Sequence, residues 1–207
     1  MNLEKFRLFV FDFDGTIKNT NQIKEEAFVE IADRHNIDKS FLKKALNIGG
    51  SRFEIFENLV DLSAKGDSAV MIEDFSRLVH KKICNCEHLP SAKEYLEHLK
   101  SNKENRVCIL SATPHAELVA IIHEIYSATF FDAVLGTSNK IGALADLMQQ
   151  FRCNPNSTVM FGDQFMDQEA AEKNHVKFVP VQSTGSWKNQ TVPEEAIVDY
   201  APLFKRP

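Results

Sequence analysis

The chain has 207 residues, 43% of them hydrophobic and 26% charged, which is enough for one sizeable core with a smaller insertion. Its 24 basic and 29 acidic residues give a net charge of −5, and no dense Lys/Arg stripe outweighs this mild acidity, which argues against a large nucleic-acid interface. No apolar run approaches the roughly 18 residues of a membrane span, and the start MNLEKFRLF lacks the pattern of a cleavable leader. We therefore expect a cytoplasmic protein with a small-molecule partner and no membrane.

The first predicted element is a buried strand over residues 6–11, FRLFVF, which is short, apolar and rich in aromatic residues. Asp12 and Asp14 follow it directly, and Gly15 comes next. Residues two apart on an extended backbone point to the same side, so these carboxylates crowd together unless a cation or a shared proton offsets their repulsion. An Asp-Gly pair after a strand is often only a turn, so a functional role depends on further residues.

The next seventy residues show helical patterns and no strand signal. Their helices are predicted to begin at Thr20 or Asn21, at Asp38, at Ser51, and at Asp67 or Ser68. We therefore predict a helical cap domain over residues 17–88, inserted after the first strand into a core domain formed by residues 1–16 and 89–207.

From Pro90 onward helices and strands alternate. Helices are predicted over 90–101, 114–127, 140–151 and 165–174, and strands over 106–111, 131–136, 157–163, 176–181 and 196–198. Strands separated by helices of this length form right-handed βαβ crossovers. The sequence thus predicts an α/β fold whose Rossmann-like, mostly parallel sheet carries helices on both faces.

Polar side chains follow these strands where each one ends, and the carboxyl ends of parallel strands share one edge of a sheet. The residues are Asp12, Asp14, Ser111, Asp163 and Asp167, together with Lys140 at a helix start. Clustered carboxylates without His or Cys suit Mg²⁺. A hydroxyl, an ammonium and backbone amides around Asp14, Gly15 and the helix start at Ser111 suit the oxygens of a phosphoryl group.

The ordered set DFDGT (12–16), the strand-terminal Ser111, Lys140 and GDQFMD (162–167) resembles the four motifs of the haloacid dehalogenase-like superfamily over nearly the whole chain. The helical insertion resembles the cap of the subgroup that contains phosphoglycolate phosphatase and β-phosphoglucomutase. Two departures stand out. Ile141 replaces a frequent Pro, and Asn19-Thr20 replaces a frequent Asp-Ser pair, but neither removes a reacting group.

The resemblance implies that Asp12 is the nucleophile that forms an aspartyl-phosphate and that Asp14 is the acid and base. It also implies which residues bind the phosphoryl group, namely Gly15, Ser111, Ala112 and Lys140. Mg²⁺ would be held by Asp12, the carbonyl of Asp14, Asp163 and Asp167. With Asp14 present, the chain resembles the phosphate-ester enzymes of the superfamily rather than its dehalogenases.

The cap is expected to supply specificity. In NIGGSRF (47–53), Gly49 and Gly50 form a possible hinge, and Arg52 is either an anion contact facing the crevice or a solvated charge at a helix start. A second cluster, CNCEH, offers Cys84, Cys86 and His88, but it lacks a fourth ligand, and we expect it to be incidental rather than a zinc site.

We expect a Mg²⁺-dependent phosphatase acting on a small phosphorylated metabolite. The alternative enzyme is a phosphomutase, which would pass the phosphoryl group to a sugar instead of water. A receiver-type signalling domain is disfavoured because it is about half as long and carries its acceptor on a middle strand. A non-catalytic binding protein for phosphorylated ligands is also disfavoured. Such a protein would have no reason to keep every charged member of an acidic cluster whose mutual repulsion costs free energy.

Overall fold

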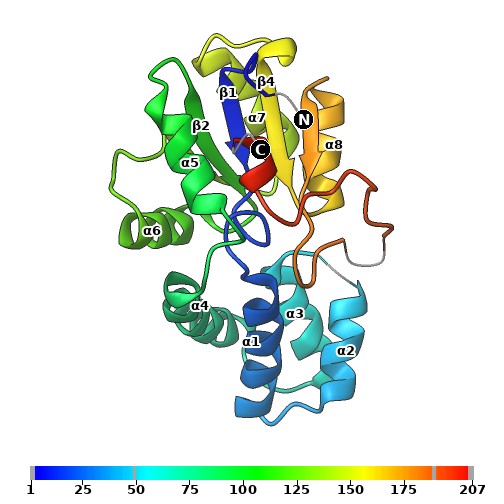
Figure 1. The fold of residues 1–207 in the computed structure, drawn as a ribbon. Coiled ribbons are helices and arrows are strands. Elements are labelled where there is room, and N and C mark those ends of the chain that lie inside the picture. Colours follow the sequence, from blue (N-terminus) through cyan, green and yellow to red (C-terminus); the bar gives the residue numbers. More distant parts are fainter. Residues whose placement is uncertain (1–2, 49, 188–189, 205–207) are drawn as a thin grey trace. The chain divides into compact units, whose positions relative to one another are not determined.

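The structure is a computed structural model that describes residues 3–48, 50–187 and 190–204 (Figure 1). Contacts between residues divide the chain into two compact units. Residues 1–21 and 86–207 form one, here called the α/β unit, and residues 22–85 form the other, the helical unit. Thr20 and Asn21 therefore belong to the α/β unit, although Asn21 is the first residue of a helix that continues into the helical unit.

The α/β unit is built on a parallel sheet that has five strands in the described part of the chain, in the order β3-β2-β1-β4-β5. The strands are β1 (Leu8–Phe11), β2 (Arg106–Ser111), β3 (Ala133–Gly136), β4 (Thr158–Gly162) and β5 (Lys177–Pro180). In the pairing register, Leu8 of β1 lies opposite Arg106 of β2 and Thr158 of β4. The predicted α/β fold with a helical insertion after the first strand is confirmed.

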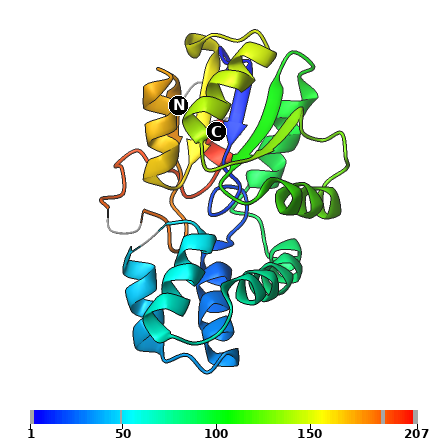
Figure 2. The ribbon, with the colours of Figure 1, turned by 180° about the vertical axis from the view of Figure 1, so that it is seen from behind.

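Helices of the α/β unit connect successive strands. They are α5 (Ala92–Ser101), α6 (His115–Ile125), α7 (Lys140–Gln150) and α8 (Phe165–Lys173), with short 3-10 turns η1 (Pro155–Ser157) and η2 (Ala201–Leu203). On one face of the sheet, Leu8 and Val10 pack with Leu144 of α7 and Ala170 of α8 in an apolar core. Figure 2 shows α7 in front of the sheet, whereas α5 lies in front of it in Figure 1.

The opposite face of the sheet is aromatic. Phe11 of β1 stacks on Phe161 of β4 with ring centroids 4.4 Å apart, and Tyr95 of α5 and Tyr200 pack around this pair. The buried hydroxyl of Tyr200 donates a hydrogen bond of 2.9 Å to the carbonyl of Thr16. Residue 200 is thereby fastened to the loop that follows β1.

The strand predicted over residues 196–198 is reduced to a single bridge between Ile197 and Val181. Val198 is 60% exposed, and the chain turns from there to bury Tyr200 under α5. Pairing therefore stops after one residue because the aromatic core draws the chain away from the sheet edge.

The helical unit contains the helices predicted for the insertion, α1 (Asn21–Arg34), α2 (Lys39–Ile48), α3 (Arg52–Ser63) and α4 (Ser68–Asn85). Ser51 and Glu54 form a capping box at the start of α3. The rings of Phe28, Phe56 and Phe75 pack against one another with centroids 4.5 to 5.6 Å apart. Burial of this aromatic cluster holds α1, α3 and α4 together.

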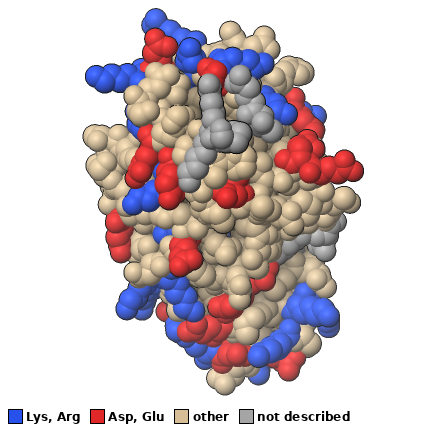
Figure 3. All heavy atoms as spheres, in the orientation of Figure 1, with Lys and Arg blue, Asp and Glu red and all other residues tan. Residues whose placement is uncertain are grey.

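No helix of the described residues is long and apolar enough to cross a lipid bilayer. On the face drawn in Figure 3, basic and acidic side chains are interspersed rather than gathered by sign. This distribution agrees with the near balance of charges in the sequence.

Candidate active site

The loops after β1 and β4 carry the acidic residues of the site. β1 and β4 are neighbouring strands. The helices that cover the sheet after them, α5 after β1 and α8 after β4, lie on opposite faces, so the chain leaves the two strands in opposite directions. Ligands of open α/β sheets bind at such a reversal of strand order, outside the carboxyl ends of the strands. The structure thus places Asp12 and Asp163 where this rule locates a binding crevice.

Lys140 joins two of the acids. Its Nζ lies 2.8 Å from Oδ1 of Asp12 and 2.6 Å from Oδ1 of Asp167, and all three side chains are buried. The other oxygen of Asp167 accepts a 3.2 Å hydrogen bond from the amide of Gln164 at the start of α8. Both oxygens of Asp167 are therefore engaged, whereas Oδ2 of Asp12 has no hydrogen bond within the described residues.

Asp163, the first residue after β4, is held from two sides. Its Oδ2 accepts a 2.7 Å hydrogen bond from the amide of Asn21, and its carbonyl accepts one of 3.1 Å from the backbone of Trp187. Its Oδ1 is buried and has no partner among the described residues.

Burial and mutual repulsion dominate the electrostatics of the cluster. Burial raises the pKa of Asp12 to about 7, against the lowering effect of Lys140, and the charges of Asp167 and Asp14 raise it further. Burial likewise raises the pKa of Asp163 well above its ordinary range. Burial alone would lower the pKa of Lys140, but the Asp12 and Asp167 carboxylates raise it above its ordinary value.

The residues present fit a divalent cation. Carboxylate oxygens of Asp12, Asp163 and Asp167 lie within 4.8 Å of one another, and Lys140 offsets only one of three negative charges. The unpartnered Oδ1 of Asp163 is a buried acceptor that a cation would satisfy. An all-oxygen donor set of this kind suits a hard ion such as Mg²⁺.

The side chain of Asp14 turns toward hydroxyl groups instead. Its Oδ1 accepts a 2.6 Å hydrogen bond from Thr20, and its Oδ2 accepts one of 2.8 Å from Thr113 and a longer one of 3.5 Å from Ser111. Ser111 Oγ also accepts from the amide of Thr113 at 3.2 Å. The predicted phosphate contact Ser111 therefore lies beside the predicted acid, and Ala112 is exposed between the two hydroxyls.

Most of the chain matches a known protein family. The family described as haloacid dehalogenase-like hydrolase matches residues 9–181 of the chain. The chain belongs to this family. No curated protein matches its sequence.

Several solved structures share the fold at low sequence identity. CbbY from Rhodobacter sphaeroides, a mutant in complex with xylulose-(1,5)bisphosphate, aligns with a TM-score of 0.77 and 13% identity over 96% of each chain. A predicted phosphoglycolate phosphatase from Haemophilus somnus aligns with a TM-score of 0.74 and 19% identity over 97% of each chain. β-Phosphoglucomutase from Clostridium difficile aligns with a TM-score of 0.65 and 19% identity, over 87% of this chain and 86% of the other. The resemblance to this subgroup is thus confirmed for the fold.

Two cap residues of this haloacid dehalogenase-like hydrolase were predicted to set specificity. The guanidinium of Arg52 lies 5.3 Å from the ring centroid of Phe75 and donates a 2.9 Å hydrogen bond to Ser76 of α4. Gly50 has φ +105° and lines a hollow together with Glu54 and other residues of α2 and α3. Gly49 lies outside the described residues. Arg52 is therefore engaged inside the helical unit rather than simply solvated, and its contact with substrate stays a prediction.

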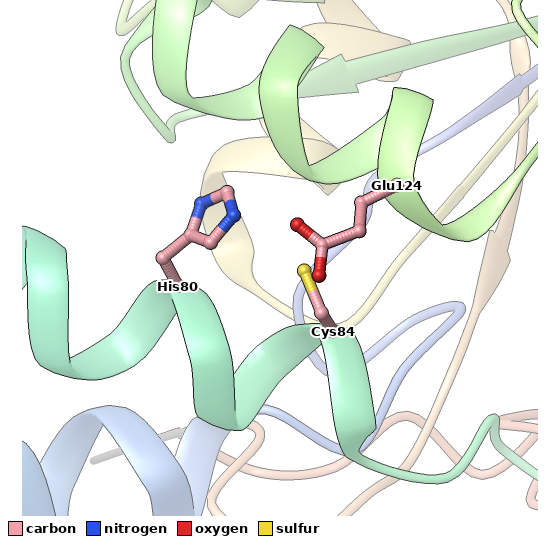
Figure 4. Close-up of side chains that lie close together, drawn as sticks. All are labelled: His80, Cys84 and Glu124. Atoms are coloured by element: carbon pink, nitrogen blue, oxygen red, sulfur yellow. The ribbon is translucent and has the colours of Figure 1, made fainter.

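Residues of the CNCEH segment lie in different units. Cys84 is on α4, where His80 one turn earlier points to the same side of the helix (Figure 4). Cys86 and His88 belong to the α/β unit. The ring of His88 forms a 2.7 Å hydrogen bond with the hydroxyl of Tyr126, and burial, with smaller contributions from nearby lysines, lowers the pKa of His88 to about 4. A neutral imidazole bound to tyrosine serves the packing of this unit.

Several residues that hold the acids in place carry no clear signal in the sequence. The sequence pattern predicts that a helix begins at Thr20 or Asn21, but it does not show that their side chains donate hydrogen bonds to Asp14 and Asp163. Only the position of Thr20, where the family often has Ser, could have signalled its role. Nothing in the sequence singles out Asn21 or Trp187.

Proposed function

We propose that the protein is a Mg²⁺-dependent phosphatase that hydrolyses a phosphomonoester of a small metabolite through an aspartyl-phosphate on Asp12. The observation that carries this proposal is the buried cluster of Asp12 and Asp163. Within the described part of the chain, Asp12 has one oxygen on Lys140 and the other without a hydrogen bond, and Asp163 has one oxygen without a partner. Family membership supports hydrolase chemistry.

In this proposal Oδ2 of Asp12 attacks phosphorus as the bond to the leaving oxygen breaks, and Asp14 gives its proton to that oxygen. Asp14 then takes a proton from a water molecule, whose oxygen attacks phosphorus and releases inorganic phosphate from Asp12. Thr20 and Thr113 orient the Asp14 carboxyl through both stages. Lys140 and Ser111, with the amides of Gly15 and Ala112, bind the phosphoryl oxygens.

Asp12, Asp163 and the carbonyl of Asp14 would hold the Mg²⁺ ion, with Asp167 as a further acidic partner through Lys140. When bound, the ion offsets the negative charge that the carboxylates and the phosphoryl oxygens bring together. Phosphorylated sugars are the first substrate class to test, because the structurally similar CbbY is in complex with a sugar bisphosphate.

The test is release of inorganic phosphate from an aryl phosphate and from a panel of phosphorylated metabolites. Hydrolysis should require Mg²⁺ and should be inhibited by Ca²⁺, whose larger and looser coordination shell misplaces the Asp12 oxygen. Full activity in excess chelator would contradict the metal assignment. Conversion of a sugar phosphate to its isomer without phosphate release would identify the alternative function, a phosphomutase.

The Asp14→Asn variant should separate the two halves of the reaction. It keeps the nucleophile, so an aryl phosphate with a good leaving group should still phosphorylate Asp12, but the phosphoenzyme should persist because no base activates water. Rapid-quench kinetics should show one burst of the aryl alcohol, and mass spectrometry should find the phosphorylated protein. Steady turnover at the wild-type rate would remove Asp14 from the mechanism.

A further inference from the structure

The side chain of Asn21 departs from the role that its position suggests. Asn21 is the first residue of α1, where the sequence pattern suggests a side-chain oxygen that caps the helix. Instead its Nδ2 donates the 2.7 Å hydrogen bond to Oδ2 of Asp163, a residue 142 positions later in the chain. Asn21 is only 7% exposed and Asp163 is fully buried, so solvent has little access to this bond.

Gly15 makes the space for this contact. Its φ of +71° favours glycine, and a Cβ added there would collide with both the Asn21 amide and the Asp163 carboxylate. The absence of a side chain in the DFDGT loop therefore allows Asn21 to reach across to the loop after β4.

The bond leaves Asp163 with one oxygen fixed and one available. Oδ2 accepts the hydrogen bond from Asn21, while Oδ1 is buried and has no partner among residues 3–48, 50–187 and 190–204. An amide is a neutral donor, so it orients the carboxylate without cancelling the negative charge that attracts a cation. A lysine or arginine at this position would orient it equally well but would compete with the ion.

We propose that Asn21 is a positioning residue of the metal site, which holds Asp163 so that its free oxygen faces the cation. The inference rests on the metal site of the proposed function. Groups that hydrogen-bond to metal ligands in this way typically contribute 10- to 100-fold to metal affinity.

The test is calorimetric titration of the metal-free protein with Mg²⁺ at one fixed pH, for the wild type, Asn21→Ala and Asn21→Leu. Leucine keeps the branching and the number of side-chain heavy atoms of asparagine and removes the donor. Both variants should bind Mg²⁺ roughly tenfold more weakly. Asn19→Ala is the matched control, because Asn19 is the same residue type two positions earlier, with an exposed side chain, and it should bind like the wild type.

Circular dichroism and thermal unfolding of the metal-free proteins separate positioning from folding. Folded Asn21 variants that bind Mg²⁺ as tightly as the wild type would overturn the inference. Loss of folding in both variants would also overturn it, because Asn21 would then serve the fold and not the metal. Failure of the wild type to bind Mg²⁺ would be seen before any variant is compared, and it would overturn the metal site of the proposed function itself.

Discussion

Replacing Asp12 by asparagine should abolish turnover and, in the same protein, stabilise the metal-free state above neutral pH. Asparagine keeps the shape of the side chain but is a poor nucleophile, so we expect activity to fall by at least roughly 10⁴-fold. Stability should rise because the substitution removes one of three buried negative charges, while Lys140 keeps its partner Asp167.

The sign of the pH dependence follows from the pKa of Asp12. Burial raises it to about 7 in the folded protein, whereas in the unfolded chain it lies near its ordinary value of about 3.9. The folded state therefore binds the proton more tightly, so this contribution to stability is complete below about pH 4 and is lost as the pH rises toward 7. The difference corresponds to at most about 4 kcal/mol of unfolding free energy.

Thermal unfolding of the metal-free proteins between pH 5 and 9 provides the measurement. The wild type should lose stability as the pH rises through 7, and Asp12→Asn should lose less. Asp61→Asn is the control, because Asp61 is an exposed carboxylate on α3 and its loss should leave the pH profile unchanged. A wild type that is equally stable at pH 5 and pH 8 would contradict the expectation.

Lys140→Met should have the largest effect on stability among single substitutions in the site. It removes both ion pairs at once and leaves Asp12 and Asp167 buried with no cation between them. Breaking a buried ion pair by removing one partner typically costs about 3–5 kcal/mol. Turnover should also fall by at least about 10²-fold, since the lysine faces the phosphoryl group in the proposed reaction.

Chemical unfolding measures this cost, and Lys100→Met is the matched control. Lys100 pairs with Asp132 at 2.7 Å, but the two side chains are 26% and 19% exposed, so its removal should cost about 1 kcal/mol. Added Mg²⁺ should recover part of the stability of Lys140→Met, because it can supply positive charge to the same carboxylates. If both variants lose the same free energy of unfolding, burial does not make the Lys140 ion pairs more important for stability than the partly exposed Lys100 pair.

The placement of the acids was predictable because it depends on a regular property of parallel sheets. Asp12 and Asp163 each follow a strand, and neighbouring parallel strands bring such residues to one edge whatever the intervening sequence. The position of Lys140 at a helix start was predictable for the same reason. Its simultaneous contact with Asp12 and Asp167 was not, because that contact depends on how α7 and α8 pack on the sheet.

The contacts of Asn21 and Thr113 could not be predicted from the sequence. Each depends on the conformation of a loop and on the direction of one side chain, which no periodic pattern records. Asn21 illustrates the difficulty, because a polar residue before a helical run favours a cap in the absence of tertiary structure. The contact of Arg52 with Ser76 escaped prediction similarly, since it joins two helices whose packing depends on the aromatic cluster between them.

The central place of β1 has a consequence for biosynthesis. This strand is made before its partners, because the strands that pair with its two edges begin at residues 106 and 158, and the tyrosine that binds the Thr16 carbonyl comes at residue 200. The helical unit, whose contacts lie within residues 22–85, has only short loops to close and can form early on the ribosome. The nascent chain therefore carries an apolar strand with two open edges until β2 is made and with one open edge until β4 is made, the kind of segment that aggregates unless chaperones shield it.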